Sequence, residues 1–134
     1  MINNMINLGD ARLLEYLQTI PGLDVPKGLA NLSNNIHQFH ELIVQVDERY
    51  WCDITRLEQA LKNGEETQVL RQIHDFKSAT GTLGLTTLQN CAVTLESHLR
   101  GNGSRADKET LKLAGTLRTE MDRFHHALLR RKTS

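Results

Sequence analysis

The apolar residues of this chain recur at helical spacing over almost its whole length. In the longest stretch, each apolar position follows the last by three or four residues without a break, which places all of them on one face of a helix. These positions are Ile36, Phe39, Ile43, Val46, Tyr50, Ile54, Leu57 and Leu61. We therefore predict one helix from Asn35 to Lys62, ended by Asn63-Gly64, although Asp53 offers a start for a second helix inside it.

Three further stripes predict long helices after this one. The first begins at Glu65-Glu66 and closes at Gly84, the second has Thr86 as its N-cap, and the third has Ser104 as its N-cap with Asp107 in a capping box. The positions expected to face the core are Val69, Ile73, Phe76, Thr80 and Leu83 in the first, Leu88, Cys91, Ala92, Leu95 and Leu99 in the second, and Leu111, Ala114, Leu117, Met121 and Leu128 in the third.

The N-terminal part predicts one or two short helices. Asp10 could cap the first, which Pro21-Gly22 ends, and Asp24 could cap a second that begins at Pro26. No stretch has the alternation of a strand. We expect an all-α protein: a single domain over residues 1–134, with a helical lead-in (1–32) and an antiparallel four-helix bundle (33–131).

Composition narrows the range of functions. The 134 residues suit one domain, and 16 Lys and Arg balance 16 Asp and Glu, which argues against a general nucleic-acid binder. The charge is unevenly placed: residues 1–96 hold 7 basic and 12 acidic side chains, a net of −5, and residues 97–134 hold 9 and 4, a net of +5. No apolar run approaches the ~20 residues of a membrane span, and the start lacks the features of a signal peptide. Two distant cysteines, Cys52 and Cys91, indicate no disulfide framework, so we expect a cytoplasmic location without membrane contact.

Common enzyme motifs are absent from the sequence. It contains no phosphate-binding GxxxxGK[ST], and no GxGxxG, GxSxG, HExxH or CxxC, so we expect no bound nucleotide. Five of the six histidines also lack the neighbours that a metal site needs, and we expect no metal. These five are His37, His40, His98, His125 and His126.

His74 differs from them in its surroundings. It lies one residue off the core stripe of its helix, so its ring should reach solvent at the edge of the buried face. Lys77 follows one turn later on the same face, and Ser78 and Gly81 leave room for another protein to approach. A neutral imidazole beside a cation suits a histidine that accepts a phosphoryl group.

The stretch from His74 to Leu85, HDFKSATGTLGL, resembles the signature of histidine-containing phosphotransfer (HPt) domains, which runs H-x-L-K-G followed by small residues, an aliphatic residue and Gly. Leu88 and Leu95-Glu96 also stand where this family carries a leucine and an LE pair. The upstream segment IPGLDV, followed by Gly28, looks like the lead-in of HPt domains found at the C-terminus of hybrid sensor kinases. Ser78 departs from the usual Gly, and Phe76 from the usual Leu.

The resemblance implies a monomeric four-helix bundle that acts as a phosphocarrier rather than as an independent enzyme. His74 would accept a phosphoryl group from the aspartate of a receiver domain, through its outer ring nitrogen, and pass it to a response regulator. Lys77 would steady that group, and Glu96 would bond the inner nitrogen. Arg71, Ser78 and Gly81 are expected on the docking surface around His74. The receiver partner would bring Mg²⁺ and most of the catalytic groups, and this domain would bind no cofactor.

Three alternatives remain open. Arg71-Gln72-Ile73-His74-Asp75 is a little like the phosphoacceptor of a sensor-kinase dimerisation domain, although no ATP-binding domain fits in the rest of the chain. An HPt-like bundle that only binds partners is the second, and a generic bundle with a surface histidine is the third. The sequence also leaves open whether the domain stands alone or ends a hybrid kinase.

Overall fold

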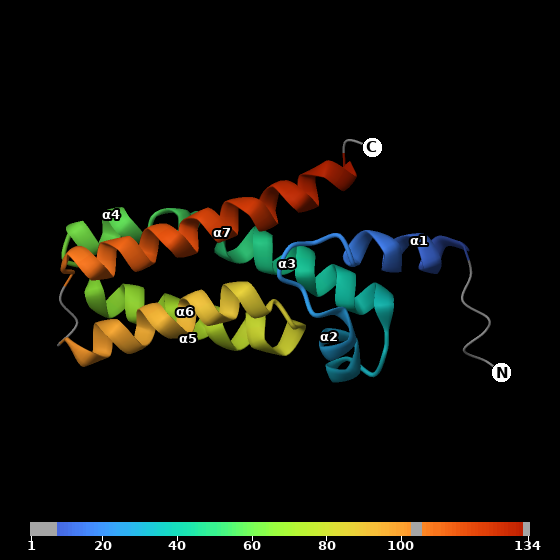
Figure 1. Ribbon diagram of the computed structural model, residues 1–134, viewed down its shortest axis with the longest axis horizontal. Coiled ribbons are helices and arrows are strands. Elements are labelled where there is room, and N and C mark those ends of the chain that lie inside the picture. The colour runs from blue at the N-terminus through green and yellow to red at the C-terminus, as the bar shows by residue number, and fades with distance from the viewer. Residues whose placement is uncertain (1–7, 103–105, 133–134) are drawn as a thin grey trace.

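The computed structural model describes residues 8–102 and 106–132, and Figure 1 shows that these residues form an elongated helical bundle. The described residues contain seven helices and no strand, although one isolated antiparallel bridge joins Leu23 to Leu85. The helices are α1 (Leu8–Leu17), α2 (Val25–Asn31), α3 (Ile36–Thr55), α4 (Leu57–Lys62), α5 (Glu66–Leu83), α6 (Thr86–Gly101) and α7 (Lys108–Lys132). The predicted all-α class is confirmed.

The long helices enclose one core. Helix α5 packs on α6, α6 on α7, α7 on α3 and α3 on α5, so the four form a closed ring of neighbours, with α4 continuing the course of α3 against α7 (Figure 1). Phe39, Phe76 and Phe124 are the largest side chains that the core buries completely. Phe124 is absent from the stripe predicted for its helix, in which Leu111 is only half-buried.

Helix α5 fixes which of its side chains can act at the surface. Its buried residues are Val69, Ile73, Phe76, Thr80 and Leu83, which is the predicted stripe. The Phe76 ring meets Tyr50 of α3 edge to face, with ring centroids 5.3 Å apart. Phe76, which replaces the Leu usual at this position, is therefore packed within the core. His74 and Lys77 lie on the same side of this stripe, where His74 is exposed and Lys77 is half-buried, and both contact Glu96 of α6.

The single helix predicted from Asn35 to Lys62 is wrong, because the chain breaks its helical course at Arg56. The Thr55 hydroxyl donates to the carbonyls of Trp51 (2.8 Å) and Cys52 (3.2 Å), and the Arg56 N–H bonds the carbonyl of Asp53, only three residues back. Hydroxyls that compete for helix carbonyls in this way disturb the ladder. The apolar stripe hides the break because the residues on both sides of it stay buried.

Some predicted helix starts are confirmed and others are corrected. Asp24 caps α2 as predicted, whereas Asn35, predicted as the first residue of the long helix, is the N-cap of α3; each accepts a bond from the backbone N–H three residues on. Asp10 lies inside the first turn of α1 instead of capping it. Leu85 rather than Thr86 takes the N-cap position of α6, because Gly84 turns the chain directly into that helix.

The start of α7 departs from the prediction in a similar way. Asp107 caps the helix, since its Oδ1 accepts the Thr110 N–H at 2.8 Å. The predicted cap, Ser104, lies outside the described residues.

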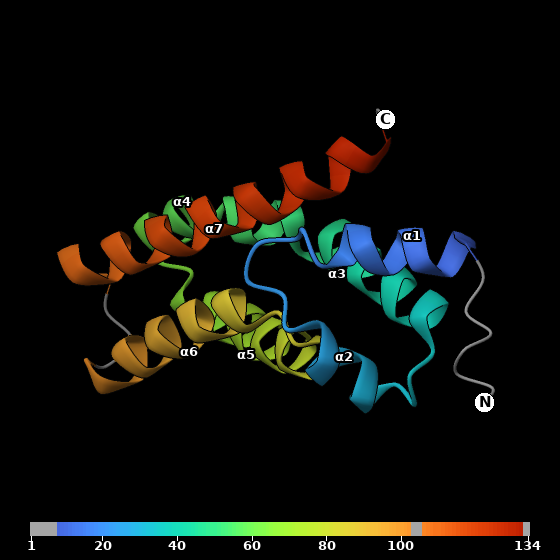
Figure 2. The same cartoon turned by 45° about the vertical axis from the view of Figure 1, so that its right-hand side comes forward.

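The lead-in is joined to the turn between α5 and α6 (Figure 2). The Asp24 N–H donates to the Gly84 carbonyl (2.7 Å), and the Thr86 N–H donates to the Gly22 carbonyl (2.9 Å). The Asn31 side-chain amide donates to the carbonyl of Thr82 (2.8 Å), which the helix leaves without an intrahelical partner. The lead-in therefore supplies hydrogen-bond partners to backbone groups at the C-terminal end of α5 and in the turn that follows. These bonds hold the turn from which α6 begins.

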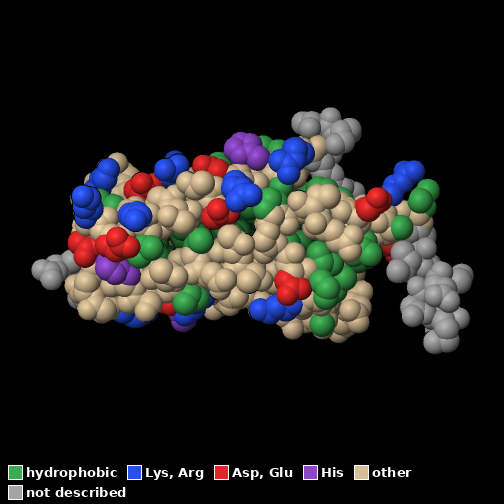
Figure 3. Space-filling model, in the orientation of Figure 1, with side chains coloured by type: hydrophobic (Ala, Val, Ile, Leu, Met, Phe, Trp, Pro, Cys, Tyr) green, Lys and Arg blue, Asp and Glu red, His purple; other side chains and the backbone are tan. Residues whose placement is uncertain are grey.

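Charges of both signs are mixed on the face that Figure 3 displays. Several basic residues of the C-terminal part pair with acids, as Arg118 does with Glu58 (2.6 Å) and Arg123 with Glu120 (3.2 Å). The Arg118–Glu58 pair thus joins a basic residue of the C-terminal part to an acid of the preceding part. In the described part of the chain, no helix combines the length and apolar character needed to cross a membrane.

Gly84 provides a direct test of this junction. Its φ is +75°, and a Cβ there would lie 2.5 Å from the carbonyl oxygen of Asp24. We expect Gly84→Ala to lower the free energy of unfolding by about 1–3 kcal/mol through the left-handed backbone alone, and further through the clash. Urea unfolding followed by circular dichroism measures this. Gly101→Ala is the matched control, because a Cβ there meets nothing within 4 Å. Equal stabilities of the two variants would contradict the account of the junction.

Candidate functional site

The site is built around Glu96, a carboxylate that α6 turns toward α5. Its side chain is only 8% exposed, although it lies in the middle of a surface helix. It occupies the helical position directly after Leu95 and one turn before Arg100, beside the buried face. A buried carboxylate needs several hydrogen bonds or a countercharge to stay ionised.

Three side chains supply these bonds. Lys77 Nζ donates to Oε1 at 2.6 Å, and an Arg100 guanidinium nitrogen donates to Oε2 at 3.2 Å. His74 Nδ1 lies 3.3 Å from the same Oε2. Burial raises the pKa of Glu96, but the bonds from Lys77, Arg100 and His74 together outweigh it and leave the pKa below its usual value. The carboxylate is therefore ionised at neutral pH.

This charge decides the tautomer of His74. An ionised carboxylate can only accept hydrogen bonds, so the contact with Glu96 requires the proton on Nδ1. In the neutral ring, Nε2 is then the nitrogen with the free lone pair. The His74 side chain is 57% exposed, so the ring bonds a buried group on its inner side and meets solvent on the other. The arrangement can hold an oriented nucleophilic nitrogen at the surface.

The residues expected to form the docking surface lie around this ring. Arg71 and Ser78 are exposed on α5, before and after His74. The Ser78 hydroxyl donates to the His74 carbonyl (3.3 Å), so it turns back onto its own helix. Gly81 differs from the expectation of an open space, since a Cβ there would lie 2.5 Å from the side-chain nitrogen of Gln89. The amide of Gln89 thus covers the helix where a bare backbone was expected.

Two residues of the site were missed from the sequence, and both lie on α6. Arg100 stands four residues after Glu96, a spacing that often pairs acid and base on a helix and could have indicated it. Gln89 had no such signal, because its place over Gly81 depends on how α5 and α6 pack.

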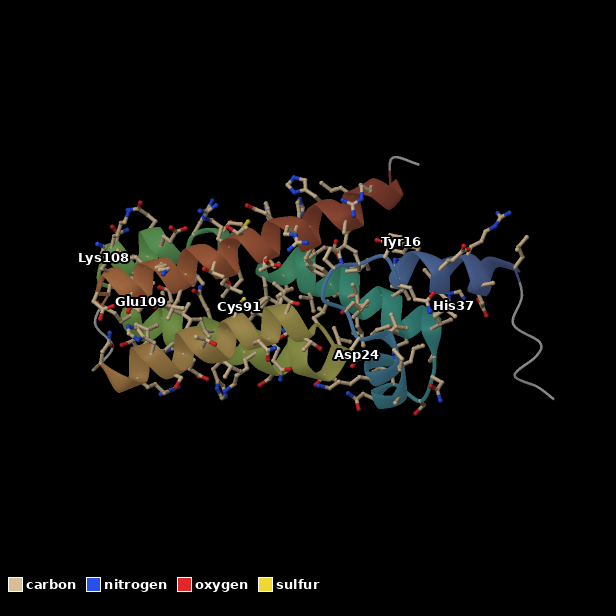
Figure 4. The ribbon with its side chains drawn as sticks, in the orientation of Figure 1. Tyr16, Asp24, His37, Cys91, Lys108 and Glu109 are labelled. Atoms are coloured by element: carbon tan, nitrogen blue, oxygen red, sulfur yellow. The ribbon has the colours of Figure 1, made fainter. Side chains whose placement is uncertain are left out.

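The other histidines do not join the site. Three of them pair with carboxylates, and Figure 4 shows one, His37, beside α1. These pairs are His37 with Asp10, His98 with Asp107, and His125 with Asp47. Within residues 8–102 and 106–132, no three His, Cys, Asp or Glu side chains form a group that could hold a metal ion. The cysteines are not bonded to each other.

The lowered pKa of Glu96 makes a prediction for acid stability. A carboxyl whose folded pKa lies below its unfolded pKa stabilises the fold fully above the unfolded value, and this contribution is lost as pH falls through the folded pKa. From about pH 5 downwards, the free energy of unfolding should therefore fall more steeply in the wild type than in Glu96→Gln. Urea unfolding at a series of pH values measures this, and Glu41→Gln controls for the loss of one negative charge at an exposed position. Parallel curves for the wild type and Glu96→Gln would contradict the prediction.

Comparisons with known proteins bear on the same segment. The model of the Hpt domain family matches residues 51–127, which is more than half of the chain and includes all of α5 and α6. No curated protein and no solved structure gave a significant match. Members of this family perform histidine phosphotransfer in phosphorelays and interact with receiver domains or response regulators. The chain therefore belongs to the Hpt domain family.

Proposed function

We propose that His74 is the phosphoacceptor of this domain, and that it takes a phosphoryl group from the aspartate of one receiver domain and passes it to another. The observation that carries this proposal is the bond between His74 Nδ1 and the ionised Glu96, on a ring that is otherwise open to solvent. The bond leaves Nε2 as the nucleophile, and it needs no movement of the bundle before reaction.

The transfer balances without a base. The Nε2 lone pair attacks phosphorus, the P–O bond of the receiver's aspartyl phosphate breaks, and the receiver carboxylate leaves with the electrons of that bond. The proton stays on Nδ1, so the ring becomes positively charged as the P–N bond forms. Glu96 lies where it meets this charge.

Lys77 supplies the nearby cation. Its ammonium is 29% exposed and is held by Glu96 Oε1, on the other oxygen from His74. From there it can offset negative charge on the transferred phosphoryl oxygens while it still contacts the carboxylate. Its bond to Glu96 keeps the ammonium close to the ring before phosphate arrives.

The partner must provide the rest of the reaction. We propose that a receiver domain brings Mg²⁺ and most of the catalytic groups, and that this domain acts as a monomeric phosphocarrier without a cofactor of its own. The Ser78 hydroxyl turns back to the His74 carbonyl, so a partner that approaches His74 meets a small side chain on the next turn of α5. We also propose that this domain stands at the C-terminus of a hybrid sensor kinase in the cytoplasm. The support for the kinase context is the resemblance of the segment IPGLDV and Gly28 to the lead-in of such HPt domains.

The alternative of a sensor-kinase dimerisation domain finds less support. In that role the acid that follows the histidine acts as its base, but the His74 ring bonds Glu96 of α6 instead of its neighbour Asp75. The core face of α5 is also covered within one chain, so no second copy is needed to bury it. A module that only binds partners would not need the histidine, lysine and carboxylate together.

Substitution of His74 tests the proposal most simply. When the protein is mixed with a phosphorylated receiver domain, acid-labile and base-stable phosphate should appear on the wild type and fall to background in His74→Gln. His37→Gln serves as the matched control, because it removes a more exposed histidine, with 71% of its side chain accessible, that lies outside the site. Transfer that persists in His74→Gln would reject the assignment.

Removal of Lys77 tests the role of the cation. Lys77→Ala should slow transfer by about tenfold or more, because a charge that stabilises the phosphoryl oxygens is lost from a partly exposed site. Rapid-quench kinetics with the same receiver measures this, and circular dichroism checks that the bundle is still folded. Lys62→Ala at the exposed end of α4 is the control. A rate and a phosphohistidine lifetime equal to those of the wild type would show that Lys77 has no such role.

A further inference from the structure

Two donors share one oxygen of Glu96. His74 Nδ1 and the Arg100 guanidinium both bond Oε2, at 3.3 and 3.2 Å, while Lys77 alone among the three bonds Oε1. Arg100 approaches from solvent, with 59% of its side chain exposed, and it stands on the same helix as the carboxylate. A stronger bond from Arg100 to Oε2 therefore weakens the bond that the same oxygen accepts from His74 Nδ1.

The proton on Nδ1 decides how readily phosphohistidine gives up its phosphoryl group. With this proton in place the ring is cationic, and when the P–N bond breaks it departs as neutral imidazole. Without the proton the ring would have to depart as an imidazolate anion, which is a far poorer leaving group. Any group that holds or releases the Nδ1 proton thus sets the donor strength of phosphorylated His74.

We propose that Glu96 holds the proton on Nδ1 of phosphorylated His74, and that Arg100 limits this hold by competing for Oε2. Together the two side chains set the pH range in which the phosphohistidine is an active donor. This rests on the proposed phosphorylation of His74. Glu96 and Arg100 act here as positioning residues, since they contact the ring or its partner and not the phosphorus.

The charges around His74 agree with these opposite roles of Glu96 and Arg100. On α5 these are Arg71, Asp75 and Lys77, of which the first two are exposed to water that screens them. On α6 they are Glu96 and Arg100. Because Glu96 is buried, its charge acts on the ring with less screening than the exposed charges do. Loss of Glu96 and loss of Arg100 should therefore shift the Nδ1 titration in opposite directions.

The experiment uses the whole chain labelled with ¹⁵N and phosphorylated by phosphoramidate. In that reaction Nε2 attacks phosphorus and ammonia leaves as its P–N bond breaks. Long-range ¹H–¹⁵N correlation spectra identify the phosphorylated His74 ring by comparison with His74→Gln, and the Nδ1 shift is followed against pH. The release of inorganic phosphate over the same pH range gives the donor strength.

We expect the Nδ1 midpoint in Glu96→Gln to lie about one pH unit lower than in the wild type, because an amide cannot offset the ring charge. In Arg100→Ala the midpoint should rise by roughly 0.3–0.5 pH unit, since a screened surface cation is removed. Phosphate release should follow the same shifts. Arg123→Ala, which removes an arginine of the same 59% exposure from α7, should leave the midpoint unchanged.

The outcomes separate this inference from the proposed function. If His74 carries phosphate but its midpoint is the same in Glu96→Gln and the wild type, the inference is overturned while the phosphoacceptor stands. An unchanged or lower midpoint in Arg100→Ala overturns the competition for Oε2. Because Arg100 is exposed, this variant should fold even if Glu96→Gln is too unstable to measure. If phosphoramidate labels His74→Gln and the wild type equally, the proposed function itself fails.

Discussion

The ionised carboxylate of Glu96 is buried between two helices, and the rest of the site depends on keeping it charged. A carboxylate in this position would take up a proton if it lacked partners, and its hydroxyl could then donate to His74 Nδ1 instead of accepting from it. Lys77 and Arg100 prevent this by supplying two charged donors. The acceptor then fixes the tautomer of His74, and the tautomer fixes which nitrogen can react. One buried charge thus connects the packing of α5 and α6 to the chemistry of the exposed ring.

The bundle brings together His74 and Glu96, which are 22 positions apart in the sequence. Helices α5 and α6 are joined through Gly84, whose left-handed backbone and close approach to Asp24 leave no room for a side chain. The lead-in bonds both sides of this turn, although it lies before the segment that matches the family. The position of Glu96 relative to His74 therefore depends on residues that carry no chemistry of their own.

Much of this was predictable from the sequence, because helical periodicity and the motif around His74 are local signals. The α5 stripe predicted the buried residues of that helix, and the residues left outside it included His74 and Lys77. What failed were features decided by competition between neighbouring groups. The break at Arg56, beside the hydroxyl bonds of Thr55, is concealed by an unbroken apolar stripe, and the cover of Gly81 by Gln89 arises from the packing of α5 against α6. The spacing of four residues could have predicted the contact of Arg100 with Glu96. Its importance for the site follows from the burial of Glu96, which the sequence did not indicate.

The proposed chemistry depends on the tautomer of unphosphorylated His74, and the ring nitrogen shifts measure that tautomer directly. Long-range ¹H–¹⁵N spectra of the free protein, recorded above the pH at which the ring loses its charge, should show a protonated Nδ1 and an unprotonated Nε2 for His74. The same ring in Glu96→Gln should lose part of this preference. A His74 ring with its proton on Nε2 in the wild type would contradict the account, because the nitrogen proposed to attack phosphorus would then have no free lone pair.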